Sequence, residues 1–130
     1  MSDHVSVSGP YTQADAPALM QQAHILVHAK CNDPCPGLVL EALASGLPVV
    51  YSKSGGTPEL VGDDAGIGVL SDVTWDRYEP PSAPAMAEAV LQIAGKRLAY
   101  AEAARQRAVD RFDCKQWIAR HRAVFEELLT

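Results

Sequence analysis

Asp33–Glu59 reads DPCPGLVLEALASGLPVVYSKSGGTPE, and it predicts, in order, a loop, a short helix, a buried strand and a glycine-rich loop. Pro36 fits the first turn of the helix, because proline fixes φ and needs no hydrogen-bond partner there. Gly46 suits a left-handed residue just after the helix. The continuous apolar run Leu47–Tyr51 is typical of a strand buried on both faces.

Two acids flank the start of this helix. Asp33 precedes it in the loop, and Glu41 follows about one turn into the helix. Between them, backbone N–H groups at the helix N-terminus could bind a phosphate. These groups belong to Cys35, Gly37 and Leu38. A carboxylate at Glu41 can accept hydrogen bonds from a ribose diol, so the arrangement favours a nucleotide site.

The whole composition is that of an ordinary globular protein, with 48% hydrophobic and 21% charged residues among 130. The net charge of −5 argues against a non-specific nucleic-acid surface. We find neither a signal-peptide pattern nor an apolar run long enough to span a bilayer. The three cysteines suggest no disulfide framework, so we expect a reducing, cytoplasmic location.

Strands and helices alternate along the chain, which indicates an α/β fold with a mainly parallel sheet. We expect about four strands, at His4–Ser8, His24–Val27, Leu47–Tyr51 and Gly66–Leu70. Besides the helix after Pro36, we expect helices at Asp15–Ala23 and Pro58–Val61, then a connector and two C-terminal helices at Ala85–Arg111 and Asp113–Leu129.

The two C-terminal helices are strongly patterned. Gly95 can kink or divide the first, whose inward positions are Met86, Ala89, Val90, Ile93 and Leu98. The second has the spacing of a buried stripe at Trp117, Ile118, His121, Val124, Phe125 and Leu128. The basic group Lys96, Arg97, Arg105, Arg107 and Arg111 is interpreted as a solvated helix face.

The two acids, the EALASGLPVV segment and the SGGTPE loop together resemble the donor-binding signature of family 4 retaining glycosyltransferases (glycosyl transferases group 1). The match continues from about Val5 to the C-terminus. These enzymes have the GT-B architecture, in which two Rossmann-like domains face each other. The resemblance implies that residues 1–130 form one partial, three-layer, Rossmann-like domain that binds the donor nucleotide. The acceptor domain and the first two βα units of the donor domain are then absent.

The resemblance also implies roles for individual residues. In the family the second acid holds the ribose of the sugar nucleotide, which implies Glu41 here. The first acid touches the donor sugar, which implies Asp33 as the catalytic residue, although Glu is commoner there. The remaining implied donor-binding positions are Cys35, Gly37, Leu38, Gly55, Gly56 and Glu59. Pro34 and Pro36 depart from the usual glycine-rich loop and remove two N–H donors.

Several of these positions keep a second interpretation. Asp33 could be a loop cap and Glu41 a helix acid that favours the macrodipole. Gly55 and Gly56 could simply make a turn, and Glu59 could cap the helix turn that follows. The thiols and histidine near the first loop match no standard zinc spacing, so we expect neither metal nor cofactor.

The missing strands have a consequence for the sheet. In the doubly wound order 3-2-1-4-5-6, the first two strands lie between the third and the fourth. Their loss leaves a bare edge, which is an association hazard. We therefore expect either a rearranged sheet, with the His4–Ser8 strand relocated, or a homodimer that covers the edge. In complete enzymes the terminal helix crosses to the other domain, so part of its apolar stripe is expected to be exposed here.

Three functions follow for this chain. The first is the donor-binding portion of a retaining hexosyltransferase, which needs no metal, uses a nucleoside-diphosphate sugar and has little activity alone. The second is a non-catalytic nucleotide-binding or assembly module that pairs with another chain. The third is a sugar-nucleotide epimerase-like protein of the same architecture, which the GTPE sequence echoes.

Overall fold

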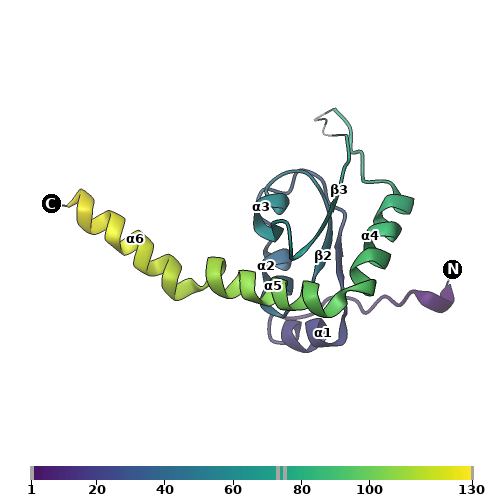
Figure 1. Cartoon of the computed structure of the whole chain (residues 1–130), viewed down its shortest axis with the longest axis horizontal. Coiled ribbons are helices and arrows are strands. Elements are labelled where there is room, and N and C mark those ends of the chain that lie inside the picture. The colour runs from purple at the N-terminus through teal and green to yellow at the C-terminus, as the bar shows by residue number, and fades with distance from the viewer. Residues whose placement is uncertain (1, 73, 75, 130) are drawn as a thin grey trace.

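The computed structural model describes residues 2–72, 74 and 76–129, and a parallel sheet lies at its centre (Figure 1). Within these residues the sheet has three strands in the order β1 (Leu26–His28), β2 (Val49–Ser52) and β3 (Gly66–Val69). Leu26 pairs with Val49, and Val49 pairs with Gly66 on its other side. The α/β class with a parallel sheet is therefore confirmed, with three strands instead of four.

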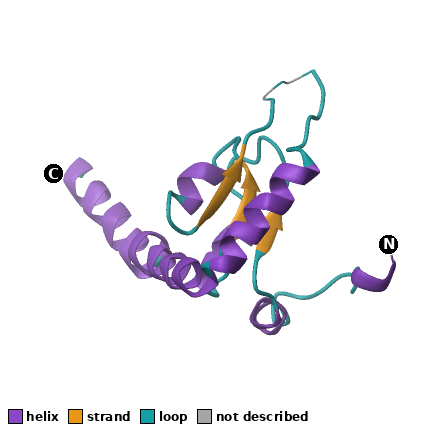
Figure 2. Ribbon diagram, turned by 45° about the vertical axis from the view of Figure 1, so that its right-hand side comes forward, coloured by secondary structure: helices purple, strands orange, loops and turns teal. Residues whose placement is uncertain are grey.

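Helices cover both faces of the sheet, so the body has three layers (Figure 2). They are α1 (Ala16–Gln22), α2 (Gly37–Ala44), α3 (Thr57–Val61), α4 (Ala83–Gly95), α5 (Arg97–Phe112) and α6 (Cys114–Leu128). On one face, α2, α3 and α5 share a core with Val49 and Tyr51. On the other, α4 packs Met86, Ala89 and Ile93 against Val50 and Val69.

The predicted N-terminal strand is absent from the described chain. Ser2–His4 forms a 3₁₀ turn, and residues 5–10 have no regular structure and are exposed. This segment has no strand beside it to satisfy its backbone, which alternation alone could not reveal. The sheet keeps the doubly wound order, so the relocated-strand alternative is wrong. β1 lies at a sheet edge with Val27 53% exposed, and a dimer that covers this edge stays a prediction.

The helix boundaries correct the sequence analysis in two places. Pro36 is the N-cap of α2, with φ −69° and ψ 111°, and so lies just outside the helix. The long C-terminal helix is divided at Gly95, which is one of the two outcomes expected from the sequence. The backbone of the next residue, Lys96, is non-helical. Three helices, not two, therefore follow the connector, and Leu98 at the start of α5 is exposed, not inward. Residues 73 and 75 of the predicted connector lie outside the described residues.

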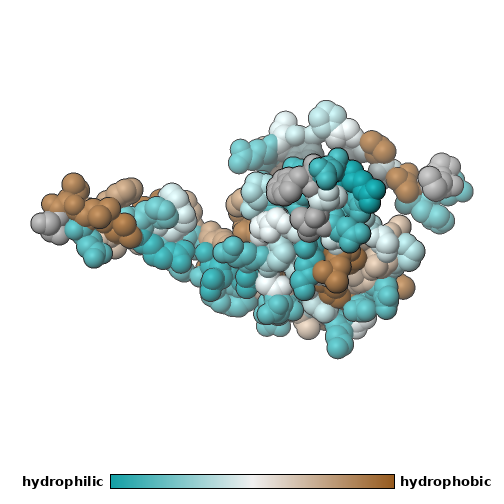
Figure 3. Space-filling view, turned by 90° about the horizontal axis from the view of Figure 1, so that it is seen from above, coloured by the Kyte–Doolittle hydropathy of each residue, from teal (hydrophilic) through white to brown (hydrophobic). Residues whose placement is uncertain are grey.

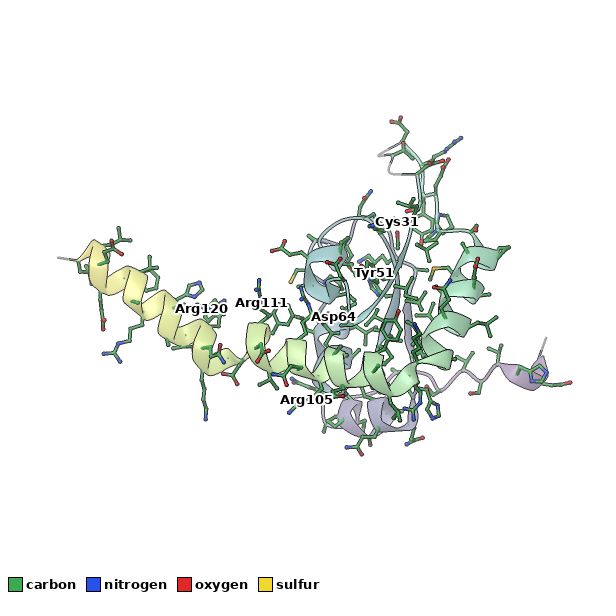
Figure 4. The ribbon with its side chains drawn as sticks, in the orientation of Figure 1. Cys31, Tyr51, Asp64, Arg105, Arg111 and Arg120 are labelled. Carbon is green, nitrogen blue, oxygen red and sulfur yellow. The ribbon has the colours of Figure 1, made fainter. Side chains whose placement is uncertain are left out.

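Two arginines of α5 bind the C-terminal ends of other helices, so the solvated-face interpretation is wrong for them. Arg105 donates a 2.6 Å hydrogen bond to the carbonyl oxygen of Ala44, which ends α2 (Figure 4). Arg107 donates to the carbonyl oxygens of Leu60 and Glu59 at 2.6 and 2.7 Å, in α3. Such charge-assisted bonds satisfy carbonyls that a helix end leaves unpaired, and they fix α5 on the body.

The last helix, α6, extends away from the body (Figure 1). Over Cys114–Leu128 no residue is buried, so the predicted apolar stripe has the right spacing but is uncovered. Among the described residues, no helix is both long and apolar enough to cross a bilayer.

Candidate functional site

Two loops meet at the carboxyl ends of β1 and β2, where α/β sheets usually bind ligands. The N–H of Gly56 donates a 2.9 Å hydrogen bond to the carbonyl oxygen of Asp33. Gly55 has φ +62°, and a Cβ at Gly55 would overlap the Asp33 backbone. A Cβ at Gly56 would overlap the carbonyl oxygen of Pro34. The two glycines therefore let one loop lie directly on the other, which is more than a simple turn requires.

Asp33 lies beside two basic side chains. Its Oδ2 is 3.1 Å from Nζ of the exposed Lys30 and 3.6 Å from Nε2 of His28. The side chains of His28 and Asp33 are only 11% and 13% exposed, so this contact is partly shielded from water. The carboxylate thus lies next to the Lys30 ammonium and the His28 ring. Its contact with a donor sugar stays a prediction.

Two buried polar atoms near these loops lack a hydrogen-bond partner among the described residues. They are Nε2 of His28, at the end of β1, and Oγ1 of Thr57, which follows Gly56. Buried polar groups usually find a partner, because leaving one unpaired costs about 1–3 kcal/mol. These two atoms therefore keep unused hydrogen-bonding capacity at the carboxyl end of the sheet.

The N-terminus of α2 opens on the first loop. Pro36 supplies no side-chain cap, so the N–H groups of Gly37 and Leu38 have no partner within the helix. Gly37 is exposed, and Cys35 just before it is an exposed free thiol. Free N–H groups and the helix dipole at this end suit an anion.

Glu41 stands apart from the two loops. It is exposed, and it borders two surface hollows of about 400 and 260 Å³ on either side of α2. The larger lies against α5 and the smaller against α1. Neither hollow is lined by Asp33 or by the glycine loop, so these two hollows do not bring the two acids together.

Glu59 lies in the first turn of α3 and is exposed. Its N–H donates to the carbonyl oxygen of Gly56 at 3.1 Å, and its own carbonyl accepts from Arg107. Its carboxylate does not cap α3 through the N–H of Gly56, because that N–H donates to the carbonyl oxygen of Asp33. The capping interpretation of Glu59 therefore loses support, while a ligand contact stays a prediction.

A hydroxyl and thiol network joins the ends of the strands, and the sequence analysis missed it. Oγ of Ser52 lies 2.9 Å from that of Ser54 and 3.0 Å from that of Ser71. Sγ of Cys31 lies 3.4 Å from Oγ of Ser52 and 3.2 Å from the Glu79 carbonyl oxygen, to which it donates (Figure 4). The sequence signal that could have indicated this network is the serine that directly follows each of two apolar strands. The network ties the first loop to the connector before α4.

The electrostatics of the core differ from those of the loops. Burial raises the pKa of Tyr51, the nearby Asp63 raises it further, and Arg107 partly opposes both. Tyr51 is only 4% exposed, so its phenol is far less hydrated than in an unfolded chain.

Nowhere in the described chain do three or more His, Cys, Asp or Glu side chains gather as a metal site would require.

The three-layer body, with loops of ligand-binding type at the carboxyl ends of its strands, has the fold of a fragment of a GT-B glycosyltransferase. Residues 1–107 match the family of glycosyl transferases group 1, so the chain belongs to that family. No curated protein sequence matches it significantly.

Solved structures agree on the fold. Sucrose-phosphate synthase from Thermosynechococcus elongatus superposes with a TM-score of 0.80 over 98% of this chain, at 21% identity. HepE of Anabaena, solved with UDP-glucose and with UDP, superposes with a TM-score of 0.66 over 86% of this chain, at 28% identity. The chain spans only 31% and 30% of these two proteins.

Proposed function

We propose that this chain is the donor-binding portion of a family 4 retaining glycosyltransferase that uses a nucleoside-diphosphate sugar. The observation that carries this proposal is the family match over residues 1–107, together with the likeness to a protein solved with UDP-glucose. Residues 1–130 would then be one partial donor domain, without the acceptor domain and the first two βα units.

In this proposal each sequence-derived residue keeps one task. Glu41 accepts hydrogen bonds from the ribose, and the N–H groups at the start of α2 receive the diphosphate. Asp33 faces the donor sugar once the sugar competes with Lys30 for its carboxylate. The loop residues Cys35, Gly37, Leu38, Gly55, Gly56 and Glu59 shape the donor side of the cleft.

The chemistry is transfer of a hexosyl group from the diphosphate to an acceptor hydroxyl with retained anomeric configuration. The protein contributes mainly positioning and stabilisation of the charge that develops on the leaving diphosphate. Here N–H groups and a helix end supply part of that stabilisation without a metal. Basic residues that complete it in the family belong to the part that this chain lacks. We therefore expect little or no turnover from the 130-residue chain alone. The location that we propose for it is the cytoplasm.

The partner in this proposal is either a separate chain that supplies the rest of the GT-B fold or a second copy that covers the β1 edge. The exposed Val27 on β1 supports a missing neighbour at that edge. It also supports a second candidate function, a non-catalytic nucleotide-binding or assembly module. An epimerase-like function ranks below both, because the family match is to transferases.

A calorimetric titration with UDP and with GDP tests the proposal. We expect either UDP or GDP to bind. The Glu41→Ala variant should bind it at least about tenfold more weakly, because the variant loses the hydrogen bonds to the ribose. Glu88→Ala is the matched control, since Glu88 is an equally exposed helical acid on α4. Binding that both variants retain would remove Glu41 from the site, and no binding by any of them would leave the assembly module as the better proposal.

A further inference from the structure

The carboxylate of Asp33 has one oxygen held by the chain and one that is free. Both basic contacts are made by Oδ2, which lies 3.1 Å from Nζ of Lys30 and 3.6 Å from Nε2 of His28. Among the described residues, Oδ1 has neither a hydrogen bond nor an ion pair. Each oxygen of a carboxylate can accept hydrogen bonds. Oδ1 is therefore available to a hydroxyl group of a ligand.

The backbone on both sides of this carboxylate is fixed. Asn32 has a left-handed conformation, with φ +55°, and its N–H donates a 3.0 Å hydrogen bond to Oγ of Ser54. The carbonyl oxygen of Asp33 accepts from the N–H of Gly56. These two bonds tie the loop to the segment that follows β2. The freedom that remains to Asp33 is rotation about its side-chain torsions, so the contacts of Oδ2 decide where Oδ1 points.

Lys30 and His28 differ in how firmly they can hold Oδ2. The Lys30 side chain is mostly exposed and flexible, so water and salt screen its ion pair. His28 ends β1, where it pairs with Tyr51 of β2, and its ring is largely buried. A ring on a paired strand has only two side-chain torsions to fix. When a sugar displaces Lys30, the His28 ring therefore stays beside Oδ2.

Nε2 of His28 has no other role in the described structure. This atom is buried and makes no hydrogen bond, and the side-chain oxygen that lies near it is Oδ2 of Asp33. Their separation is longer than an N–H···O hydrogen bond of about 2.7–3.2 Å, so a shift of about 0.5 Å would form one. That bond would satisfy the buried nitrogen. It requires a ring whose proton is on Nε2.

We propose that His28 is a positioning residue, whose Nε2–H holds Oδ2 of Asp33 so that Oδ1 is presented to a hydroxyl of the donor sugar. The inference rests on the proposed function, in which Asp33 faces that sugar. His28 itself makes no contact with the donor, because its Nε2 is covered. The end of the body that carries Cys31 and the connector is mainly hydrophilic when seen from above, which suits a sugar there (Figure 3).

The tautomer of His28 gives a test that needs no ligand. In ring ¹⁵N–¹H correlation spectra we expect the proton on Nε2. Asp33→Ala should move the Nε2 resonance of His28 and leave that of His24, an exposed histidine before β1, unchanged. A ring with its proton on Nδ1 alone would overturn the proposal, because a bare Nε2 cannot donate to the carboxylate. An unmoved His28 resonance in Asp33→Ala would overturn it as well.

Calorimetric titrations with UDP and UDP-glucose, and with GDP and GDP-mannose, test the positioning role. His28→Phe should bind the sugar nucleotide at least about fivefold more weakly, and should bind the bare diphosphate as the parent does, since only the sugar reaches Asp33. His28→Gln should retain most of the affinity, because its side-chain N–H can take the place of Nε2–H. His24→Phe is the matched control and should change neither affinity. Circular dichroism checks that each variant folds.

A double-mutant cycle shows whether His28 acts through Asp33. In an Asp33→Ala background, His28→Phe should cause no further loss of affinity for the sugar nucleotide. Effects of the two substitutions that simply add would overturn the inference. So would a parent-like Kd of His28→Phe for the sugar nucleotide in a chain that binds the diphosphate, and this result would leave the proposed function intact. No binding of either diphosphate by the parent chain would overturn the proposed function and this role together.

Discussion

Helices α2 and α6 look alike as sequence patterns but have opposite surroundings. In α2, Val39, Ala42 and Leu43 are fully buried against the sheet and α5, and Arg105 binds the end of the helix. In α6, an equally regular apolar face has no cover in the single chain, with Phe125 61% exposed. Periodicity therefore predicts that a helix has an apolar face, while the partner of that face depends on the rest of the fold.

The largest expected effect lies in the core under α2. Leu43→Ala removes a fully buried side chain and should destabilise the chain by about 2–5 kcal/mol. Phe125→Ala on α6 removes a side chain that is 61% exposed and should change stability by less than about 0.5 kcal/mol. Urea unfolding monitored by circular dichroism compares them. Similar losses for the two variants would mean that α6 is covered within its own chain.

The close approach of the two loops gives the next effect. Gly56→Ala places a methyl group against the carbonyl of Pro34 and should cost about 1–3 kcal/mol. Gly37→Ala is its control, because a Cβ there meets no described atom within 4 Å, and it should be neutral or slightly stabilising. If Gly56→Ala unfolds at the same urea concentration as the parent chain, the two loops do not touch as described.

Loss of Arg107, which binds carbonyl groups at the end of α3, should destabilise the chain about as much as Gly56→Ala or slightly less. Arg107→Leu removes two charge-assisted hydrogen bonds to α3 carbonyls and should cost about 1–3 kcal/mol. Arg111→Leu, at an exposed position of the same helix, should be nearly neutral. Thermal melts of the two variants give the comparison, and equal melting temperatures would restore the solvated-face interpretation of Arg107.

The smallest effect concerns Tyr51. Burial raises its folded-state pKa above the ordinary value, so its contribution to stability is complete below about pH 10. That contribution should be lost as the pH rises through the folded-state pKa, because the unfolded chain releases the proton first. Tyr51→Phe should remove this part of the alkaline loss when urea unfolding is followed from pH 8 upward. An unchanged alkaline slope in Tyr51→Phe would assign the loss to other groups.

The sequence predicts the parts of the fold that depend on local pattern. The run Leu47–Tyr51 is buried and contains most of the central strand, which spans Val49–Ser52, and the loop–helix–strand–loop order of its neighbourhood is as expected. The strand predicted at His4–Ser8 is absent because a strand needs a neighbouring strand to pair with. The alternation of apolar residues does not show whether such a neighbour exists. The roles of Arg105 and Arg107 also depend on helices 61 and 47 residues away, which charge patterns along α5 cannot show.

The candidate site divides in the same way. The family resemblance assigned the Asp33 loop and the glycine loop to one donor site, and the Gly56–Asp33 hydrogen bond shows that the two loops meet. Their contacts with a donor stay a prediction. It did not predict that Asp33 would lie against Lys30 and His28, or that Ser52 would anchor a network reaching the connector. These contacts join residues whose neighbours are set by the sheet, not by the chain around them.

An NMR titration of the isotopically labelled chain with UDP locates the bound nucleotide on the described residues. We expect the amide shifts of Gly37, Leu38, Gly55 and Gly56 to change together, while those of α6 stay unchanged. Shifts confined to the hollow at Phe112 and Cys114, or no shifts at saturating UDP, would contradict a donor site at the carboxyl end of the sheet.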